Sequence, residues 1–294
     1  MSRAASTKRV SRFAFRSSRQ PSTIRPRSTS VCLSKQRQIG TSSAPRTHGE
    51  AEVDSLNGGA ALREPRVLTG KTETHLCSPT QAQTLGARVH RDVVEPFLNL
   101  RADAKDKGFD LQILSGFRTF QSQATIWNKK CSGSRPVLDS SGSPLDIADM
   151  SPRGIVYSIL RWSALPGASR HHWGTDIDVF DENARPTDYE IDLVPEEVEA
   201  NGMFGPLHEW LDDLLKANTA YGFFRPYDKD RDGVAPERWH LSHAPVAARC
   251  DRAFSIDLLR TTLLESDIEL QNIVLDNLDD IYERFVININ PESS

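Results

Sequence analysis

The spacing of apolar residues changes along the chain, and each spacing predicts a different element. Between residues 78 and 107 large apolar residues recur every three or four positions, as on one face of an amphipathic helix closed by the glycine that follows. The apolar run at residues 111–114 predicts a short strand. From residue 175 to residue 180 polar and apolar residues alternate, as in a strand at the edge of a sheet, so Asp176 and Asp178 should share a face.

Capping residues and apolar stripes predict the remaining elements. Thr119 suits the N-cap of a helix to about residue 129, and Ser151 followed by Pro152 opens a helix to about residue 162. The loop at residues 131–149 is long enough to cover a cleft. Further helices are predicted at about 195–201 and 206–218, and strands at 223–226 and 239–243. After residue 244 apolar stripes predict helices to residue 286 that pack back onto the core, or alternatively bind a partner helix.

This mixture of elements predicts an α+β fold. We expect a small antiparallel sheet flanked by helices, with a C-terminal helical extension over residues 244–286 packed on the core. The chain has 294 residues, of which 38% are hydrophobic, enough for a packed core. No stretch approaches the roughly 18 apolar residues of a membrane-spanning helix, so no transmembrane segment is predicted.

The charge is divided unevenly along the chain. Residues 1–50 contain eleven Lys or Arg and one acid, Glu50, although the whole chain has a formal charge of -4. We therefore expect a disordered basic Ser/Arg-rich leader over residues 1–68 and an acidic folded domain over residues 69–291. The leader's composition fits a transit peptide, an anion-binding tail or a plain solvated tail, and residues 1–50 show no clear secretory signal. Aromatic residues do not interleave with its arginines, so no nucleic-acid partner is expected.

Two familiar kinds of metal site do not fit the sequence. The four cysteines are widely spaced and form no Cys-x-x-Cys pair, which argues against a cysteine zinc site. We interpret them as buried or unreactive thiols, with one or two disulfides as an alternative. Residues 228–233 resemble the start of an EF-hand loop, but its twelfth position is Trp239 instead of Glu. A solvated acidic turn is the better interpretation, with a weak irregular calcium site as the alternative.

A third combination of residues has the right chemistry for zinc. A catalytic zinc site needs three protein ligands and an open fourth position, and His171, Asp178 and His240 are of suitable types. Gly174 could form a turn that brings the first two ligands to one side. Glu237 lies three residues before His240, where a carboxylate can take a proton from water and pass it to a leaving amine.

The motifs around these residues resemble the VanY-type zinc D-alanyl-D-alanine carboxypeptidases of peptidase family M15. The resemblance rests on Ser-x-His-x-x-Gly-x-x-x-Asp at residues 169–178, on Glu-x-x-His at 237–240, and on Ser-Gly-Phe-Arg-Thr-x-x-x-Gln at 115–123. It implies that a Zn²⁺ ion is held by His171, Asp178 and His240, with Glu237 as the catalytic base and Arg118 as a substrate-binding or transition-state cation. We regard residues 115–243 as the part that carries the catalytic motifs.

The resemblance also implies a substrate and a location. The substrate would be a peptidoglycan stem peptide that ends in a D-residue, and the reaction would release D-alanine in the periplasm or cell envelope. Ser169, Gln123 and Ser115 are candidates for binding substrate or orienting the site. Alternatives are an L,D-carboxypeptidase or endopeptidase on the same scaffold, or a catalytically silent zinc-binding module like the related Hedgehog signalling domain. We expect a monomer.

Two residues in the motif have open roles. Asp176 stands where the family usually has a small residue, and it could compete with Asp178 as a ligand. His172 adjoins His171, and we favour His171 because neighbouring residues of a strand point to opposite sides. By the same alternation His243 should point away from a metal bound by His240.

Overall fold

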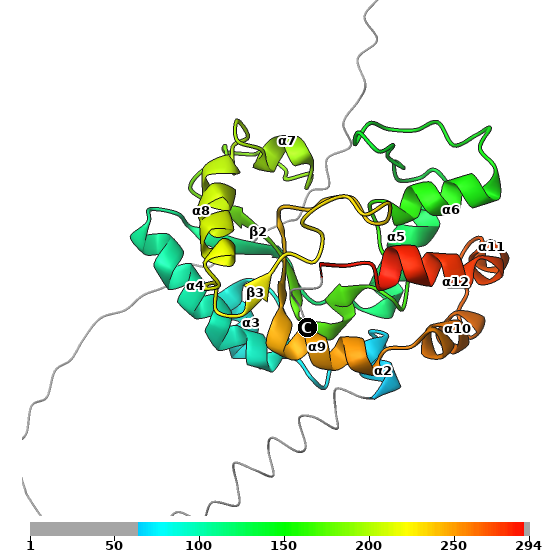
Figure 1. Cartoon of the computed structure of the whole chain (residues 1–294), viewed down its shortest axis with the longest axis horizontal. Helices are drawn as coiled ribbons and strands as arrows, with labels where there is room; N and C mark the ends of the chain where they lie inside the picture. Colours follow the sequence, from blue (N-terminus) through cyan, green and yellow to red (C-terminus); the bar gives the residue numbers. More distant parts are fainter. Residues whose placement is uncertain (1–63, 291–294) are drawn as a thin grey trace, which may run out of the picture. The chain divides into compact units, whose positions relative to one another are not determined.

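A computed structural model describes residues 64–290 of the chain (Figure 1). The predicted leader up to residue 63 lies outside the described residues. Its predicted boundary at residue 68 is wrong, because α2 (Pro65–Leu68) already belongs to the folded part. Val67 and Leu68 are fully buried in the hydrophobic core. The folded part therefore includes residues that the composition had assigned to the leader.

The fold is α+β, as predicted, with one four-stranded antiparallel sheet in the order β1-β2-β4-β3. The strands are short and far apart in sequence: β1 (Leu111–Ser115), β2 (Asp176–Asp181), β3 (Phe223–Phe224) and β4 (His240–His243). The prediction of an edge strand near residue 175 is wrong, because β2 pairs on both sides and all six of its residues are buried. Alternation along this strand separates two buried faces, one apolar and one polar, and not core from solvent.

The apolar face of the sheet packs on helices from the first half of the chain and on α8 (Gly205–Lys216). Ile177, Val179 and Leu241 join one hydrophobic cluster with residues of α3 (Pro79–Leu85) and α4 (Val94–Asp106). The predicted continuous helix over residues 78–107 is wrong. Gly86 ends α3 with a φ of 79°, and a 3₁₀ turn (Arg91–Val93) precedes α4. A left-handed residue stops the helix although the apolar spacing continues past it.

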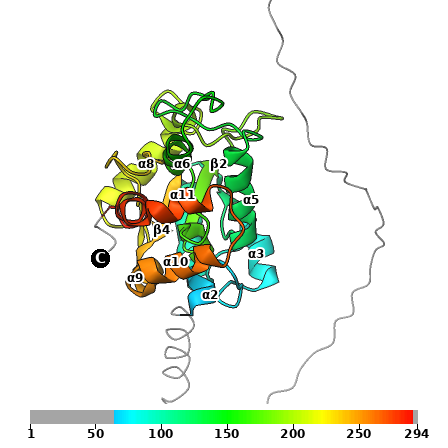
Figure 2. The ribbon, with the colours of Figure 1, turned by 90° about the vertical axis from the view of Figure 1, so that its right-hand side faces the viewer.

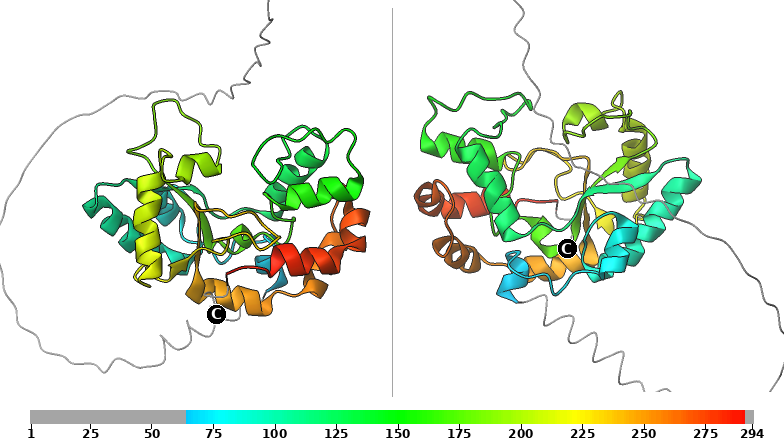
Figure 3. Two further views of the ribbon diagram at one scale, coloured as in Figure 1. Left: turned by 45° about the horizontal axis from the view of Figure 1, so that its top comes forward. Right: turned by 180° about the vertical axis from the view of Figure 1, so that it is seen from behind.

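A second hydrophobic cluster holds the helices of the other side of the molecule. It joins α5 (Phe120–Cys131) and α6 (Pro152–Leu160) to the C-terminal helices. Those helices are α9 (Ala244–Ala253), α10 (Ile256–Leu264), α11 (Gln271–Asp276) and α12 (Leu278–Ile281), followed by a π-helical turn (Tyr282–Val286). Figures 1 and 2 show α10 to α12 gathered beside α5 and α6, and the view from behind in Figure 3 shows α3 and α4 on the opposite side. The predicted packing of the C-terminal extension on the core is confirmed.

The capping predictions agree with the structure. The Thr119 hydroxyl accepts a hydrogen bond from the backbone N–H of Ser122, and Ser151 does the same for Gly154. These caps fix the starts of the two helices that flank the long loop after Cys131. The helix predicted at 195–201 is shorter, with α7 ending at Val198 (Pro195–Val198). No helix among the described residues is long and apolar enough to cross a bilayer.

Candidate metal centre

The polar face of the sheet collects the predicted ligands by strand register. Asp178 on β2 lies directly opposite His240 on β4, and the next pair on this face is Asp176 with Ser242. His171 comes from a short 3₁₀ helix, η2 (Arg170–Trp173), that leads into β2. The expected turn at Gly174 is present, with a φ of 68°. Three side chains from two strands and one turn thus converge on one point.

His171, Asp178 and His240 form the one group of potential metal ligands found among the described residues, with donor atoms within 4.8 Å of one another. His171 Nε2 lies 3.5 Å from Asp178 Oδ2, and His240 Nδ1 lies 3.2 Å from Asp178 Oδ1. Ligands about 2.1 Å from a tetrahedral zinc are about 3.4 Å apart, so these distances suit that ion. The acidic turn at residues 228–232 is not in such a group, since Asp230 pairs with Arg161 and Asp228 with Arg231.

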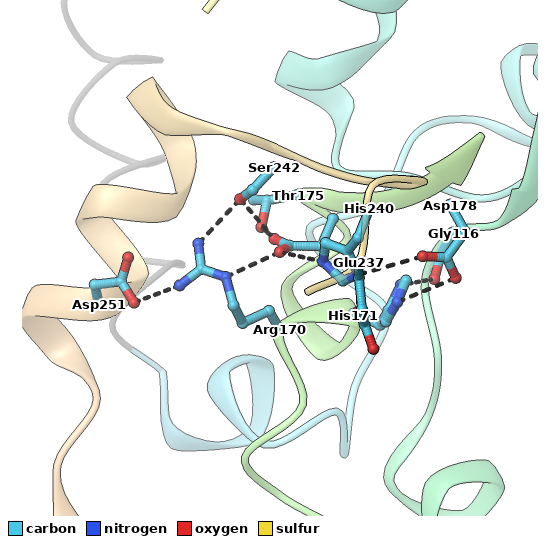
Figure 4. Close-up of polar contacts among 10 residues, drawn as sticks. Gly116, Arg170, His171, Thr175, Asp178, Glu237, His240, Ser242 and Asp251 are labelled. Carbon is cyan, nitrogen blue, oxygen red and sulfur yellow. Dashed lines mark hydrogen bonds and ion pairs between the residues drawn. The ribbon is translucent and has the colours of Figure 1, made fainter. Parts of the chain in front are cut away.

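Hydrogen bonds hold both imidazoles in the tautomers that a metal requires. Nδ1–H of His171 donates to the Gly116 carbonyl at 2.9 Å, which leaves Nε2 free to face Asp178. Nε2–H of His240 donates to Asp176 Oδ1 at 2.9 Å, which leaves Nδ1 facing the same point. Figure 4 shows His171, Asp178 and His240 turned toward one another. Such outer partners orient metal-binding histidines in many proteins.

The charges of the group also fit a cation. Burial is the main cause that lowers the pKa of His171, to about 4, so its ring is neutral at pH 7. Burial also opposes protonation of His240, but the carboxylates of Asp176, Asp178 and Glu237 outweigh it and raise the pKa of His240 well above its ordinary value. Without a metal these carboxylates therefore favour a second proton on Nδ1, and a cation bound there would replace that proton. Asp178 Oδ1 is buried, and although His240 Nδ1 lies 3.2 Å away, the two atoms are not aligned as a hydrogen bond requires. A buried carboxylate oxygen without a well-oriented donor is costly, and a bound cation would satisfy it.

Glu237 and Arg118 stand beside the three ligands. Glu237 lies on the turn that enters β4, and its Oε2 is 3.3 Å from His240 Nδ1. Burial raises the pKa of the Glu237 carboxyl. The Arg118 guanidinium donates to Gln123 Oε1 at 2.9 Å and to Ser115 Oγ at 3.0 Å. Gln123 and Ser115 therefore hold Arg118 and are not among the residues that line the cleft.

The site lies in a cleft of about 520 Å³. Its walls include Arg118, Ser169 and Glu237. The loop that we expected near a cleft contributes Arg135, Pro136, Leu138, Gly142 and Pro144. The Ser169 hydroxyl is buried and has no hydrogen-bond partner within the described residues, so it is free to meet a ligand. The sequence did not single out Lys130, Arg135 and Tyr227, which also line the cleft. The one feature of the sequence that could have identified Lys130 is a charged residue on the face of an amphipathic helix that packs against the core.

The two open roles in the motif have structural answers. Both ring nitrogens of His172 are used, because Nδ1–H donates to the Arg118 carbonyl at 2.7 Å and Nε2 accepts from the Gly167 N–H at 3.1 Å. The strand argument for His171 over His172 is wrong in its premise, since both residues lie in a 3₁₀ helix. Asp176 is outside the metal group and lies behind His240. His243 packs against Phe223, on the other face of the strand.

The three described cysteines, Cys77, Cys131 and Cys250, are free thiols, which agrees with the favoured interpretation. Burial is the main cause that raises the pKa of both Cys131 and Cys250 to about 12. Thiols with such pKa values are protonated at neutral pH and react slowly. Cys32 lies outside the described residues.

Comparisons with known proteins identify the family of the chain. An uncharacterized protein of Haemophilus influenzae is 38% identical over 101 residues, which are 34% of this chain and 69% of that protein. A second uncharacterized protein of the same organism is 30% identical over 124 residues, 42% of this chain and 93% of that protein. The solved structure of VanYB in complex with D-alanine-D-alanine is similar with a TM-score of 0.41 and 19% identity, covering 66% of this chain and 91% of that one. The family model of VanY, D-alanyl-D-alanine carboxypeptidase, matches residues 86–246, more than half of the sequence. The chain therefore belongs to the VanY D-alanyl-D-alanine carboxypeptidase family.

Proposed function

We propose that this protein is a zinc metallopeptidase that removes the terminal D-alanine from peptidoglycan stem peptides. The observation that carries the proposal is the convergence of His171, Asp178 and His240 within 4.8 Å, with the Glu237 carboxylate 3.3 Å from His240. Family membership supports the substrate class. The arrangement of two imidazoles, one carboxylate ligand and one free carboxylate is typical of hydrolytic zinc sites.

His171 Nε2, Asp178 and His240 Nδ1 would hold the zinc ion. When bound there, zinc would supply Lewis-acid activation of water and of the scissile carbonyl. The poorly satisfied Oδ1 of Asp178 and the hydrogen bonds of the two rings to Gly116 and Asp176 support this assignment. Each of the three side chains is nearly inaccessible to solvent, which limits competition from bulk water.

Glu237 acts as general base and then as general acid. Its carboxylate takes a proton from the attacking water and delivers it to the amine of the departing D-residue. Burial raises the pKa of this carboxyl, which brings its proton affinity nearer to the working pH. The raised pKa also helps Glu237 to keep the proton after it has been taken from water and before it is delivered to the amine.

Arg118 stabilises the negative charge that develops on the scissile carbonyl oxygen. Gln123 and Ser115 each accept a hydrogen bond from its guanidinium and hold it in place before substrate arrives. A preorganised donor of this kind commonly contributes a few kcal/mol to catalysis. The Ser169 hydroxyl would donate a hydrogen bond to the bound peptide or accept one from it.

The catalytic domain in this proposal begins at about Pro65 and extends to the end of the described residues. Peptidoglycan lies outside the cytoplasmic membrane, so a working enzyme would act in the periplasm or cell envelope. The role of the basic residues before this domain stays open as a transit peptide, an anion-binding tail or a solvated tail.

Release of free D-alanine from a muropeptide tests the proposal. We expect Glu237→Ala to lower kcat by about 10²- to 10⁴-fold at equal zinc occupancy. Equal release by the wild type and this variant would exclude the mechanism. Activity restricted to L,D-bonds or to cross-bridged peptides would identify the alternative carboxypeptidase or endopeptidase. A wild type silent toward all of these peptides would favour a zinc-binding module without catalytic activity.

A further inference from the structure

Three cations line the catalytic cleft without a carboxylate partner. These are Arg118, Lys130 and Arg135, and no ion pair among residues 64–290 includes any of them. Arg118 has two neutral acceptors, Gln123 and Ser115. The other two are not explained by the mechanism above. Charges that line a cleft without an ion pair among the described residues point to an anionic ligand.

Lys130 is the most informative of the three because it is buried. It lies near the end of α5 and is only 7% exposed. Its Nζ donates a hydrogen bond to Ser163 Oγ at 2.7 Å, and this neutral hydroxyl is its one partner among residues 64–290. Taking an ammonium out of water is costly unless a countercharge compensates. Ser163 lines the same cleft, so the ammonium is held at the cavity wall.

Both the charge of Lys130 and its surroundings are suited to an incoming anion. Burial, followed by repulsion from Arg135, lowers the pKa of the Lys130 ammonium to about 8, so it remains mostly protonated at neutral pH. Glu237 and Arg118 line the same cleft as Lys130. Arg135 is exposed on the loop after α5 and also lines the cleft. The cationic part of the cleft thus adjoins the residues that would act on the peptide bond.

We propose that Lys130, assisted by Arg135, binds the free C-terminal carboxylate of the peptide substrate and restricts the enzyme to the last bond of the chain. This inference rests on the proposed function. In a carboxypeptidase the terminal carboxylate lies one residue beyond the scissile carbonyl, so its binding group must adjoin the group that stabilises that carbonyl. Lys130 satisfies this requirement relative to Arg118. Its partner Ser163 precedes Ala164, whose carbonyl accepts a hydrogen bond from the Gln123 side chain that holds Arg118.

The buried Lys130 ammonium also disfavours cleavage within a longer peptide, as an endopeptidase would carry out. A longer peptide would place an uncharged amide where the terminal carboxylate would lie, and the buried ammonium would stay without a countercharge. Sites built around a buried polar group reject ligands that lack its partner, because the group loses water and gains nothing in return. Lys130 is therefore a specificity-determining residue.

A pair of peptides that differ only in the terminal charge tests the inference. One is a stem pentapeptide that ends in D-alanine, and the other is its C-terminal amide. We expect the wild type to prefer the acid at least tenfold in kcat/KM, and Lys130→Gln to reduce this preference about tenfold, mainly through KM for the acid. The matched control is Lys129→Gln, which removes an exposed charge from the adjacent position and should leave the preference unchanged. An unchanged acid-to-amide ratio in Lys130→Gln would overturn the inference.

Two further measurements identify the cause if a variant or the wild type fails. Additional variants detect a folding defect in Lys130→Gln, and calorimetry tests the carboxylate subsite even if the proposed function is wrong. Arg135→Gln, at an exposed position, should reduce the preference two- to fivefold without loss of folded protein, and Lys130→Arg should restore part of it. If the wild type cleaves neither peptide, the proposed function is wrong. Calorimetric titration of both peptides into the zinc-loaded Glu237→Ala protein, with and without Lys130→Gln, still tests the subsite. Equal dissociation constants for acid and amide in the presence of Lys130 would exclude it.

Discussion

Asp176 Oδ1 accepts a hydrogen bond from Nε2–H of His240 at 2.9 Å, on the opposite edge of the ring from the nitrogen that faces Asp178. Asp176 is itself fixed by Arg170, whose Nε donates to it at 2.9 Å, and by the Ser242 hydroxyl at 2.9 Å. Figure 4 shows the Arg170 guanidinium between Ser242 and Asp251, with a hydrogen bond to each. Asp176 stands where the family usually has a small residue, and it orients the His240 ring without being one of the potential metal ligands.

Removal of the Asp176 carboxylate should weaken zinc binding. Asp176→Ala frees the His240 ring to rotate or change tautomer, and we expect about 10- to 100-fold lower zinc affinity in a chelator competition. Asp251→Asn removes the other carboxylate of Arg170 but leaves the bond to His240, so its zinc affinity should stay near that of the wild type. Equal losses in the two variants would indicate a general effect of the buried Arg170 charge.

Replacement of Arg118 should affect the chemical step. Arg118→Lys keeps a charge but loses the forked guanidinium that Gln123 and Ser115 hold, so we expect kcat to fall about 10²- to 10³-fold with little change in KM. Steady-state kinetics on the stem pentapeptide measures both constants. Ser115→Ala removes only one of the two contacts and should have a smaller effect. A rise in KM at constant kcat would instead assign Arg118 to ground-state binding.

Acid should destabilise the fold through buried histidines away from the metal centre. Burial is the main cause that lowers the pKa of His75 and His243 to about 4 and that of His90 to about 3, from an ordinary 6.5. The unfolded chain takes up these protons below about pH 6.5 and the native state does not. Each histidine therefore lowers the free energy of unfolding as pH falls from 6.5 toward 4, by up to about 1.4 kcal/mol per pH unit.

Urea unfolding of the metal-free protein at several pH values measures this slope. His75→Gln should flatten it, because Gln keeps a donor for the His172 carbonyl but does not titrate. A slope identical to that of the wild type would assign the acid sensitivity to other groups.

Two left-handed glycines should differ in their tolerance of alanine. A Cβ on Gly174 would lie 2.6 Å from the backbone nitrogen of His90, whereas a Cβ on Gly86 would meet nothing within 4 Å. Gly86→Ala should cost only the backbone strain, about 1–2 kcal/mol. Gly174→Ala adds a clash with a backbone atom, and we expect about 3 kcal/mol or more together with impaired zinc binding. Similar losses in urea unfolding would show that the segment around His90 moves to accept the methyl group.

Local signals predicted the elements whose ends are marked by side chains. Thr119 and Ser151 cap their helices through their own hydroxyls, so the bonds are between near neighbours in sequence. The break at Gly86 was missed because apolar spacing persists across it, and only the φ of 79° ends the helix. The central position of β2 was missed because its polar residues face a buried site and not solvent.

By itself the sequence determined the identity of the metal-binding candidates, the separate base and the family resemblance, because these depend on residue type and spacing. The tertiary structure decided which residues face each other across the sheet and which charged side chains are buried. Pairing of β2 with β4 put Asp178 beside the metal-facing nitrogen of His240 and Asp176 behind the ring. Packing of α5 buried Lys130 beside a neutral hydroxyl, in the wall of the catalytic cleft. Contacts between residues so distant in sequence follow from the folded chain, since no local pattern specifies which strands pair or which charges lose their solvent.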